Sequence, residues 1–240
     1  VRVDFSYYTP TGADVIGEIR LDDLFVEEVP QPEAPPKNRV LNSSFEIASV
    51  TGWPDSWRLG QAGPTAYYDF PMIGDPEGSR RDPDAKVHGD YSFRVVVPEI
   101  GLFSMNYMHA FISSGARGGI PIEPGNTYTF SIYMRGRQGG EPVEITVCNF
   151  VNNSAVTEEG VTKTFRLTSD WKRYAVTIEI PKTGWRRDNY HDVLVTIDPQ
   201  NGGDVLWLDA AQFEEGTQPT EYQPDDFEPV PSPETYPKAK

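Results

Sequence analysis

The chain is poor in cysteine and in cationic side chains. A single cysteine, Cys148, stands in 240 residues, which excludes an intrachain disulfide and a cluster of thiolate metal ligands. Lys and Arg number 21 against 36 Asp and Glu, a formal net charge of −15 that repels nucleic acids and anionic membrane surfaces. No apolar run approaches the roughly 20 residues that a membrane-spanning helix needs. We therefore expect neither nucleic-acid binding nor insertion into a membrane.

Signals of catalysis are scarce as well. The three histidines, His88, His109 and His191, have no spacing typical of a metal site or a catalytic triad, and no Gly-x-Ser-x-Gly motif is present. A pair of carboxylates for glycoside hydrolysis could stand among the 36 acidic residues, because only their separation in space identifies such a pair. We expect a non-catalytic protein, which could form part of a larger glycoside hydrolase or lyase.

Apolar residues instead recur with a period of two. The alternating runs lie at residues 93–97, 128–134, 143–148, 174–180 and 193–197. Turn residues such as Pro124-Gly125-Asn126 and Gly139-Gly140 separate them, and no helical stripe exceeds two turns. Strict alternation is typical of strands with one buried face. The pattern predicts an all-β fold, an antiparallel β-sandwich of the jelly-roll type.

Two proline-rich stretches, residues 30–37 and 223–240, are predicted to be extended linkers on either side of a domain at residues 38–222. Residues 19–28 match residues 206–215 without a gap. We interpret residues 1–29 as the C-terminal strands of a preceding homologous module, and the first residues look like a cut inside a longer polypeptide. Chance similarity between two acidic strands is the alternative.

Five landmarks in sequence order resemble the jelly-roll carbohydrate-binding modules of families 4, 9 and 22, which are similar to galactose-binding domains. They are Arg39–Glu46 with Gly52-Trp53-Pro54, His88–Val95, Ile122–Ser131, Asp170–Tyr174 and Trp207–Glu214. The resemblance implies an opening strand at residues 39–46 and places Trp53, Trp171 and Trp207 in the core. It also implies binding of a polysaccharide or oligosaccharide.

The same resemblance implies a structural Ca²⁺ between the first strand, the Gly-x-x-Ser strand and the last strand. The matching positions are Glu46, Asp90 and Asp209, with a backbone oxygen near Ser44. Calcium takes six to eight oxygen ligands, which carboxylates and carbonyls can supply. The alternative is that Glu46 and Asp90 are solvated surface acids and that Asp209 caps a turn.

Aromatic side chains that lack an obvious place in the core are candidates for a sugar platform, because sugar rings pack flat on aromatic faces. Their polar neighbours would bind the hydroxyl groups. The candidates are Trp185, Arg186 and Tyr190 in one polar loop, Tyr133 and Arg135 on the polar parity of a strand, Tyr107 and His109, and Tyr67. Ordinary surface packing is the alternative for each of them.

These observations predict a polysaccharide-binding module of a multimodular extracellular protein, secreted by a bacterium or held at its surface. Its task would be to keep a neighbouring catalytic domain near its substrate. Two alternatives remain open. The domain could be a structural spacer or adhesion module of a cell-surface or filament protein, or an accessory domain that packs on a hydrolase or lyase and stabilises it.

Overall fold

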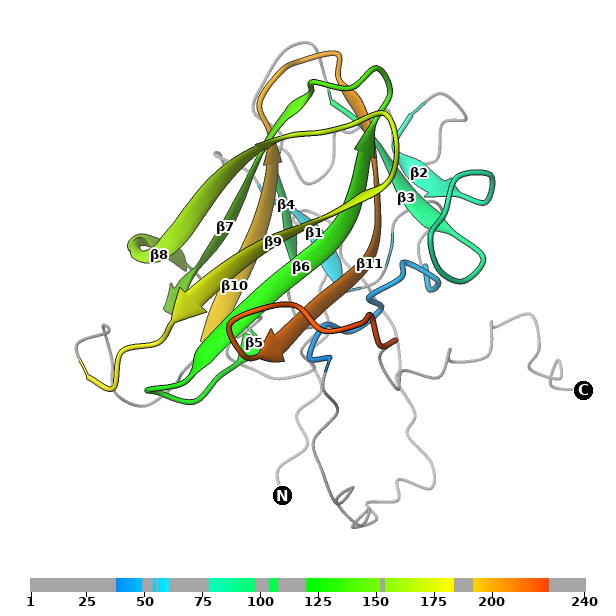
Figure 1. The fold of residues 1–240 in the computed structure, drawn as a ribbon. Coiled ribbons are helices and arrows are strands. Elements are labelled where there is room, and N and C mark those ends of the chain that lie inside the picture. The colour runs from blue at the N-terminus through cyan, green and yellow to red at the C-terminus, as the bar shows by residue number, and fades with distance from the viewer. Residues whose placement is uncertain are drawn as a thin grey trace, which may run out of the picture.

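The computed structural model describes residues 38–48, 54, 56–60, 78–97, 104–107, 120–151, 154–183 and 192–224. The regular secondary structure within these residues consists of β-strands alone (Figure 1). The strands are β1 (Trp57–Gly60), β2 (Arg80–Asp82), β3 (Ser92–Val96), β4 (Ser104–Tyr107), β5 (Ile120–Pro121), β6 (Thr127–Gly136), β7 (Pro142–Val151), β8 (Ser154–Arg166), β9 (Lys172–Glu179), β10 (Asp192–Pro199) and β11 (Val205–Glu215). The predicted preceding module (1–29), the first linker (30–37) and most of the second linker (223–240) lie outside the described residues.

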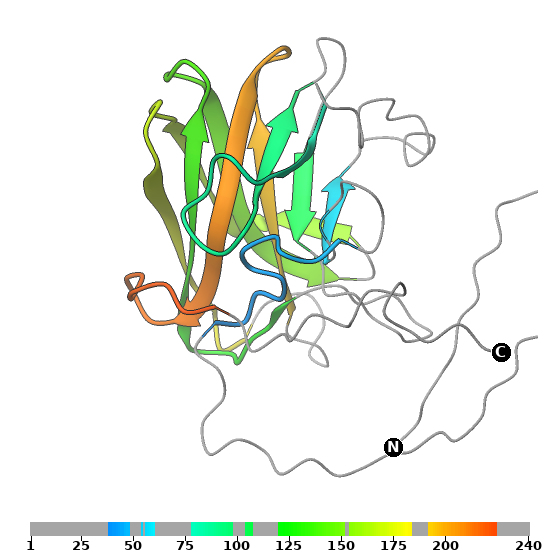
Figure 2. The same ribbon diagram turned by 90° about the vertical axis from the view of Figure 1, so that its right-hand side faces the viewer.

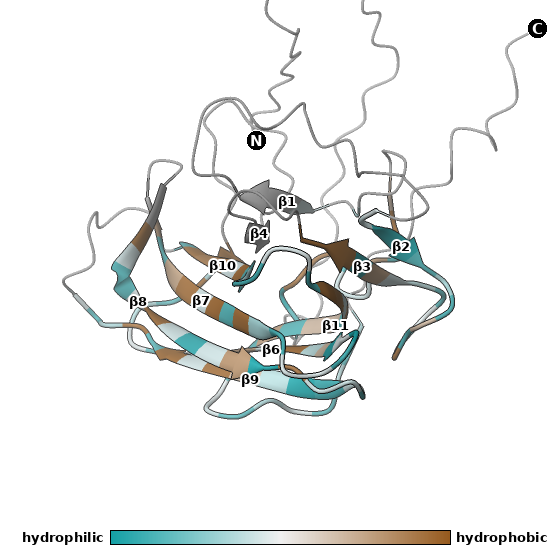
Figure 3. Cartoon of the chain, turned by 90° about the horizontal axis from the view of Figure 1, so that it is seen from above, coloured by the Kyte–Doolittle hydropathy of each residue, from teal (hydrophilic) through white to brown (hydrophobic). Residues whose placement is uncertain are grey.

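The strands form two antiparallel sheets that face each other (Figures 1 and 3). One sheet, here called the β7 sheet, has the order β1-β4-β10-β7-β8, with β5 paired to β10. The other, the β6 sheet, has the order β2-β3-β11-β6-β9. This arrangement confirms the predicted all-β sandwich, and it gives the domain one buried interior and two outer faces.

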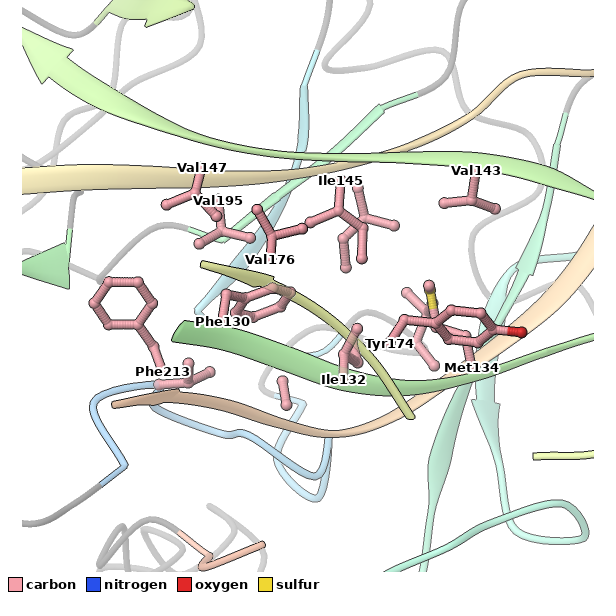
Figure 4. Close-up of a cluster of buried hydrophobic side chains, with 14 of the residues drawn as sticks. Phe130, Ile132, Met134, Val143, Ile145, Val147, Tyr174, Val176, Val195 and Phe213 are labelled. Carbon is pink, nitrogen blue, oxygen red and sulfur yellow. The ribbon is translucent and has the colours of Figure 1, made fainter. Parts of the chain in front are cut away.

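The interior is filled by the alternating apolar residues that the sequence singled out. In Figure 3, β7 alternates between brown and teal along its length, as a strand with one buried face should. Figure 4 shows side chains of both sheets pointing toward one another, among them Phe130 and Ile132 from β6 and Ile145 and Val147 from β7. These four side chains have no exposed surface. Burial of such apolar surface at about 25 cal/mol per Å² is the main stabilising contribution to the sandwich.

The expected opening strand at residues 39–46 is wrong: residues 41–44 form a turn. Asn42 and Phe45 have φ angles of 51° and 63°, in the left-handed region that a strand cannot accommodate. The Asn42 side chain stabilises the turn by donating to Ile47 O (2.8 Å) and accepting from Ile47 N (2.9 Å). The turn drives Phe45 into the core, where its ring lies 4.9 Å from that of Trp57.

Buried Asn38 joins the incoming and outgoing chain. Its side-chain amide donates to Ala211 O (3.0 Å) and to Gln223 O (2.9 Å), and its oxygen accepts from Phe213 N (3.2 Å). Figures 1 and 2 show the blue segment that begins at residue 38 beside the end of β11. The two ends of the domain are therefore fastened together at one place.

A β-bulge interrupts β11 opposite β6. Asp209 pairs with Tyr133 and Gln212 pairs with Ser131, so β11 carries one extra residue across this step. Ala210, inside the bulge, has a φ of 48°. A bulge bends its strand and re-aims the side chains beside it. The bulge lies next to Asp209, whose carboxylate accepts hydrogen bonds from the backbone N–H groups of Val87 and His88.

Candidate functional site

The predicted sugar-binding residues fall into two groups in the structure. Trp185, Arg186, Tyr190, His109 and Tyr67 lie outside the described residues, and their role stays a prediction.

The other predicted sugar contacts lie in β4 and β6. Tyr107 belongs to β4, where its backbone pairs with Trp57 and Val195, two buried core positions, while Asn106 pairs with Thr196. Tyr133 and Arg135 are half-buried on the outer face of β6. The structure thus separates Tyr107 from Tyr133 and Arg135 by placing them in different sheets.

The outer face around Tyr133 and Arg135 is a network of rings and guanidinium groups, here called the aromatic–arginine face (Arg94, Trp207, Arg135, Tyr133 and Arg173). Trp207 pairs with Arg94 on one side and Arg135 on the other, and Tyr133 pairs with Arg173. Arg135 lies 4.9 Å above the Trp207 ring, and Arg173 lies 5.7 Å from the centre of the Tyr133 ring. Cation–π contacts of this kind contribute about 0.5–1 kcal/mol each at exposed sites.

Hydrogen bonds tie this face down further. Trp207 Nε1 donates to Asp82 Oδ2 (2.9 Å), and Arg173 Nε donates to Ser131 Oγ (3.1 Å). Burial acts to raise the pKa of Asp82, but its bonds from Trp207 and the Asp84 N–H, with the charges of Arg80 and Arg94, hold that pKa below its usual value. The rings and cations on this face contact one another, while Arg135 Nε and Arg173 Nη2 are buried without a hydrogen-bond partner.

Trp207 is not a core residue as expected, because it is half-buried on this outer face. Its neighbours Leu206 and Leu208 have no exposed surface. Since successive residues of a strand point to opposite faces, the two leucines force Trp207 outward. The alternation around Trp207 was the signal that could have placed it correctly. Trp171, also expected in the core, is half-buried too, and Trp53 lies outside the described residues.

The outer face of the β7 sheet carries small polar side chains instead. We call this surface the polar face; it consists of Glu144, Thr146, Thr162, Thr164, Thr196 and Asp198. Thr146 pairs with Thr196 and Thr162, and Glu144 pairs with Asp198 and Thr164, so the six residues form two rows across three strands. Thr146 and Thr162 share a hydrogen bond of 2.8 Å, and Thr164 donates to Glu144 Oε1 at 3.2 Å.

The two carboxylates of the polar face influence each other. Burial raises the pKa of Asp198 above its usual value; a bond from the Gln200 side chain opposes that shift and the charge of Glu144 adds to it. Two acceptors and several hydroxyl groups therefore share a surface on which further negative charge is unfavourable. Sequence reasoning noted the polar parity of β7 but missed this face, because the pairing of β7 with β10 is not local in sequence.

An apolar cluster continues the outer face of the β7 sheet beyond these polar rows. Cys148 pairs with Leu194 and packs with it and Phe150 in a cluster separate from the main core. Cys148 has no exposed surface, and burial raises the pKa of its thiol to about 11, with a bond at Val156 lowering it and the charge of Glu158 raising it. A thiol held protonated and covered in this way is not a nucleophile.

Two of the predicted calcium ligands converge on the segment 87–91. Glu46 Oε1 accepts the N–H groups of Asp90 (3.0 Å) and Tyr91 (3.1 Å). Asp209 Oδ2 accepts those of Val87 (2.6 Å) and His88 (3.0 Å).

Their surroundings suit a cation only in part. Burial raises the pKa of Asp209 to about 6; bonds from three backbone N–H groups lower it and the nearby charge of Glu46 raises it. A Cβ at Gly89 would lie 2.2 Å from Glu46 Oε1, so glycine lets the segment wrap this carboxylate closely. Asp90 is exposed, while Ser44 is buried. Within the described ranges, no three His, Cys, Asp or Glu side chains gather around one point.

In the described part of the chain, no helix is long and apolar enough to cross a membrane. Fold and surface together define the class of protein: an antiparallel jelly-roll sandwich with its polar side chains spread over sheet faces. A family model described as "Carbohydrate binding domain" matches residues 112–187, a range that includes β5 to β9. No curated protein sequence matches the chain.

Solved structures similar to the chain have low sequence identity to it. A tailspike protein 4 domain of bacteriophage CBA120 is 13% identical with a TM-score of 0.50, over 75% of this chain and 22% of that one. A structure described as "CBM4 structure and function" is 17% identical (TM-score 0.47), over 74% and 99% of the two chains. The CBM22-1 xylan-binding domain from Paenibacillus barcinonensis Xyn10C is 12% identical (TM-score 0.45), over 72% and 91%.

The resemblance to jelly-roll carbohydrate-binding modules is confirmed, and the matched family is one of non-catalytic binding modules.

Proposed function

We propose that the chain binds a neutral polysaccharide across the polar face of the β7 sheet. The observation that carries the proposal is the double row of hydroxyl and carboxylate side chains on three adjacent strands. Strands lie about 4.8 Å apart, so the rows present polar groups at regular intervals across a surface wide enough for several hydroxyl groups. Carboxylate oxygens accept hydrogen bonds from sugar hydroxyls, and the threonine hydroxyls can donate or accept.

The charge of the polar face supports a neutral ligand rather than an acidic one. Glu144 and Asp198 face each other across β7 and β10, and their charges already disfavour each other. A uronic acid would add a third negative charge, in a chain whose net charge is −15. Like charges at such distances repel, so we expect acidic glycans to bind more weakly than neutral ones.

In the parent protein the module would act as a tether outside the cell. A weak binding module raises the effective concentration of an attached catalytic domain at an insoluble substrate. The proline-rich stretches 30–37 and 223–240 suit such an attachment, since proline-rich linkers are extended. The spacer and accessory-domain alternatives predict no retention on any polysaccharide.

Affinity electrophoresis tests this proposal. The panel contains xylan, mixed-linkage β-glucan and galactan, with polygalacturonate as the acidic member. We expect retardation by a neutral glycan that Thr146→Val weakens and Thr177→Val leaves unchanged. The two threonines are matched: both are half-buried, and both share a hydroxyl–hydroxyl bond with a cross-strand threonine, at 2.8 Å and 3.0 Å. Equal retardation of the two variants would remove the site from the polar face.

The same gels examine the other predicted contacts. Tyr133→Ala tests the aromatic–arginine face, and Trp185→Ala tests the polar loop outside the described residues. Loss of retardation in Tyr133→Ala, with Thr146→Val unaffected, would transfer the site to the β6 sheet. Absence of retardation by every glycan would favour the structural spacer.

We also propose a structural Ca²⁺ held by Glu46 and Asp209, with backbone oxygens near Ser44 and in the segment 87–91. Two neighbouring carboxylates, one of them fully buried, would supply part of the six to eight oxygen ligands that this hard cation takes. The ion would tie the 38–48 segment to β11. We expect Ca²⁺ to raise the thermal unfolding temperature of the wild type, and Glu46→Gln to reduce that increase; an increase unchanged in Glu46→Gln would contradict this site.

A further inference from the structure

A cavity of about 210 Å³ opens between two turns at one end of the sandwich. One turn, residues 137–141, joins β6 to β7, and the other, residues 200–204, joins β10 to β11. Each turn is bonded to the strand that follows the other turn: Arg137 N donates to Val205 O (2.9 Å), and Gln200 N donates to Pro142 O (3.0 Å). Each turn passes from one sheet to the other, so whatever binds between them contacts both connections.

Glu141 and Asp204 line this cavity, and each has one buried carboxylate oxygen that lacks a hydrogen-bond partner. Glu141 is only 7% exposed; its Oε1 accepts the Gln138 N–H at 2.7 Å, whereas its buried Oε2 has no partner. Oδ2 of Asp204 is likewise buried and unpaired. A buried carboxylate oxygen without a donor is costly, which singles out this pair among the described residues.

The electrostatics of the pair point the same way. Burial raises the pKa of Asp204, the negative charge of Glu141 raises it further, and a bond from Asn201 opposes the shift. Arg137 also lines the cavity, but no described donor, its guanidinium included, reaches either unpaired oxygen. A bound cation relieves the repulsion between two carboxylates that line one cavity.

Glycine allows this arrangement at Gly136. A Cβ at that position would lie 1.9 Å from Glu141 Oε2, closer than any side chain can approach. Gly136 thus gives the Glu141 carboxylate its place beside the cavity.

We propose that Glu141 and Asp204 form a divalent-cation site, best suited to Ca²⁺, that joins the two connections between the sheets. Asn201 and Gln138 line the same cavity. Their side-chain amide oxygens and water would complete the oxygen ligands that calcium needs. The site is separate from the proposed ion at Glu46 and Asp209. Five residues of extended chain, roughly 16 Å, separate Asp204 from Asp209. It does not depend on sugar binding.

Calorimetric titration of CaCl₂ into the chelator-treated chain tests the site. We expect the double variant Glu141→Gln/Asp204→Asn to bind one Ca²⁺ fewer per chain than the wild type. The variant Glu215→Gln/Asp170→Asn, which removes two exposed carboxylates elsewhere, serves as the charge-matched control and should bind like the wild type. An unchanged stoichiometry in the double variant, or no Ca²⁺ bound by the wild type, would overturn the proposal.

Thermal unfolding distinguishes the loss of a Ca²⁺ site from a general loss of stability in the double variant. In chelator the double variant should unfold at the same temperature as the wild type or higher, because the repulsion between the carboxylates is gone. In Ca²⁺ it should gain less than the wild type does. A double variant that is less stable in chelator and gains as much from Ca²⁺ as the wild type would show that the two carboxylates are ordinary structural acceptors.

Discussion

On the outer face of the β6 sheet, Trp207 and Tyr133 are each covered by a guanidinium group, and Trp207 is also bonded to a buried carboxylate. On the outer face of the β7 sheet, Thr146 shares one bond with Thr162, and Thr164 donates one bond to Glu144. Contacts between the large side chains of the β6 sheet contribute to folding. A hydroxyl group can both donate and accept, so Thr146 and Thr162 keep hydrogen-bonding capacity beyond the one bond that they share. An aromatic side chain outside the core can therefore contribute to folding through its contact with a neighbouring cation.

The largest expected effect concerns stability on the aromatic–arginine face. Trp207→Ala should lower the free energy of unfolding by about 3 kcal/mol, since it removes a large half-buried ring, its bond to Asp82 and its contact with Arg135. Urea unfolding measures the loss, with Trp207→Phe as a milder control. Retention on the neutral glycan should remain. A stable Trp207→Ala that no longer binds would reverse the roles of the two faces.

Next comes the alkaline stability of the β7 sheet. The pKa of Cys148 is raised by burial from 9.0 to about 11, so the neutral thiol stabilises the fold fully below pH 9. That contribution is lost as the pH rises through 11, and its size is on the order of 2.5 kcal/mol. We expect unfolding experiments between pH 8 and 11 to show a steeper loss of stability in the wild type than in Cys148→Ala. Parallel curves would mean that the thiol is not shielded.

A smaller effect should concern affinity alone. Asp198→Asn keeps the shape of the side chain but weakens a charged acceptor on the polar face, and we expect about tenfold weaker binding, or about 1.4 kcal/mol. Calorimetry with a soluble oligosaccharide of the retained glycan measures the change. The stability of this variant should equal or exceed that of the wild type, because the repulsion with Glu144 is relieved. Unaltered affinity would exclude Asp198 from the site.

The smallest expected effect isolates one cation. Arg135→Met preserves most of the apolar stem over Trp207 and removes the charge, so the free energy of unfolding should fall by about 1 kcal/mol or less. Glycan affinity should not change. A larger loss of affinity than of stability would place Arg135 in a binding site, as the sequence predicted.

Most of the long strands could be predicted because apolar and polar residues alternate along them. Phe130, Ile132 and Val147 are buried as their parity requires. The prediction of an opening strand was wrong because Asn42 and Phe45 adopt left-handed backbone angles. Neither residue type indicates such angles as distinctively as glycine does. The polar face could not be predicted, since its rows depend on which strands are neighbours. Thr146 and Thr196 are 50 positions apart, and only the sheet order brings them together.

The hydrogen bonds by which Asn38 joins the two ends of the domain have a mechanical consequence. Because one side chain grips both Ala211 and Gln223, tension applied through the two flanking segments would meet at this point rather than stretch the sandwich from end to end. A pull would first break a handful of hydrogen bonds at the base, while the paired strands above carry no force. The folded domain would therefore lie to one side of the line of force. Several such domains in series would not form a rigid rod.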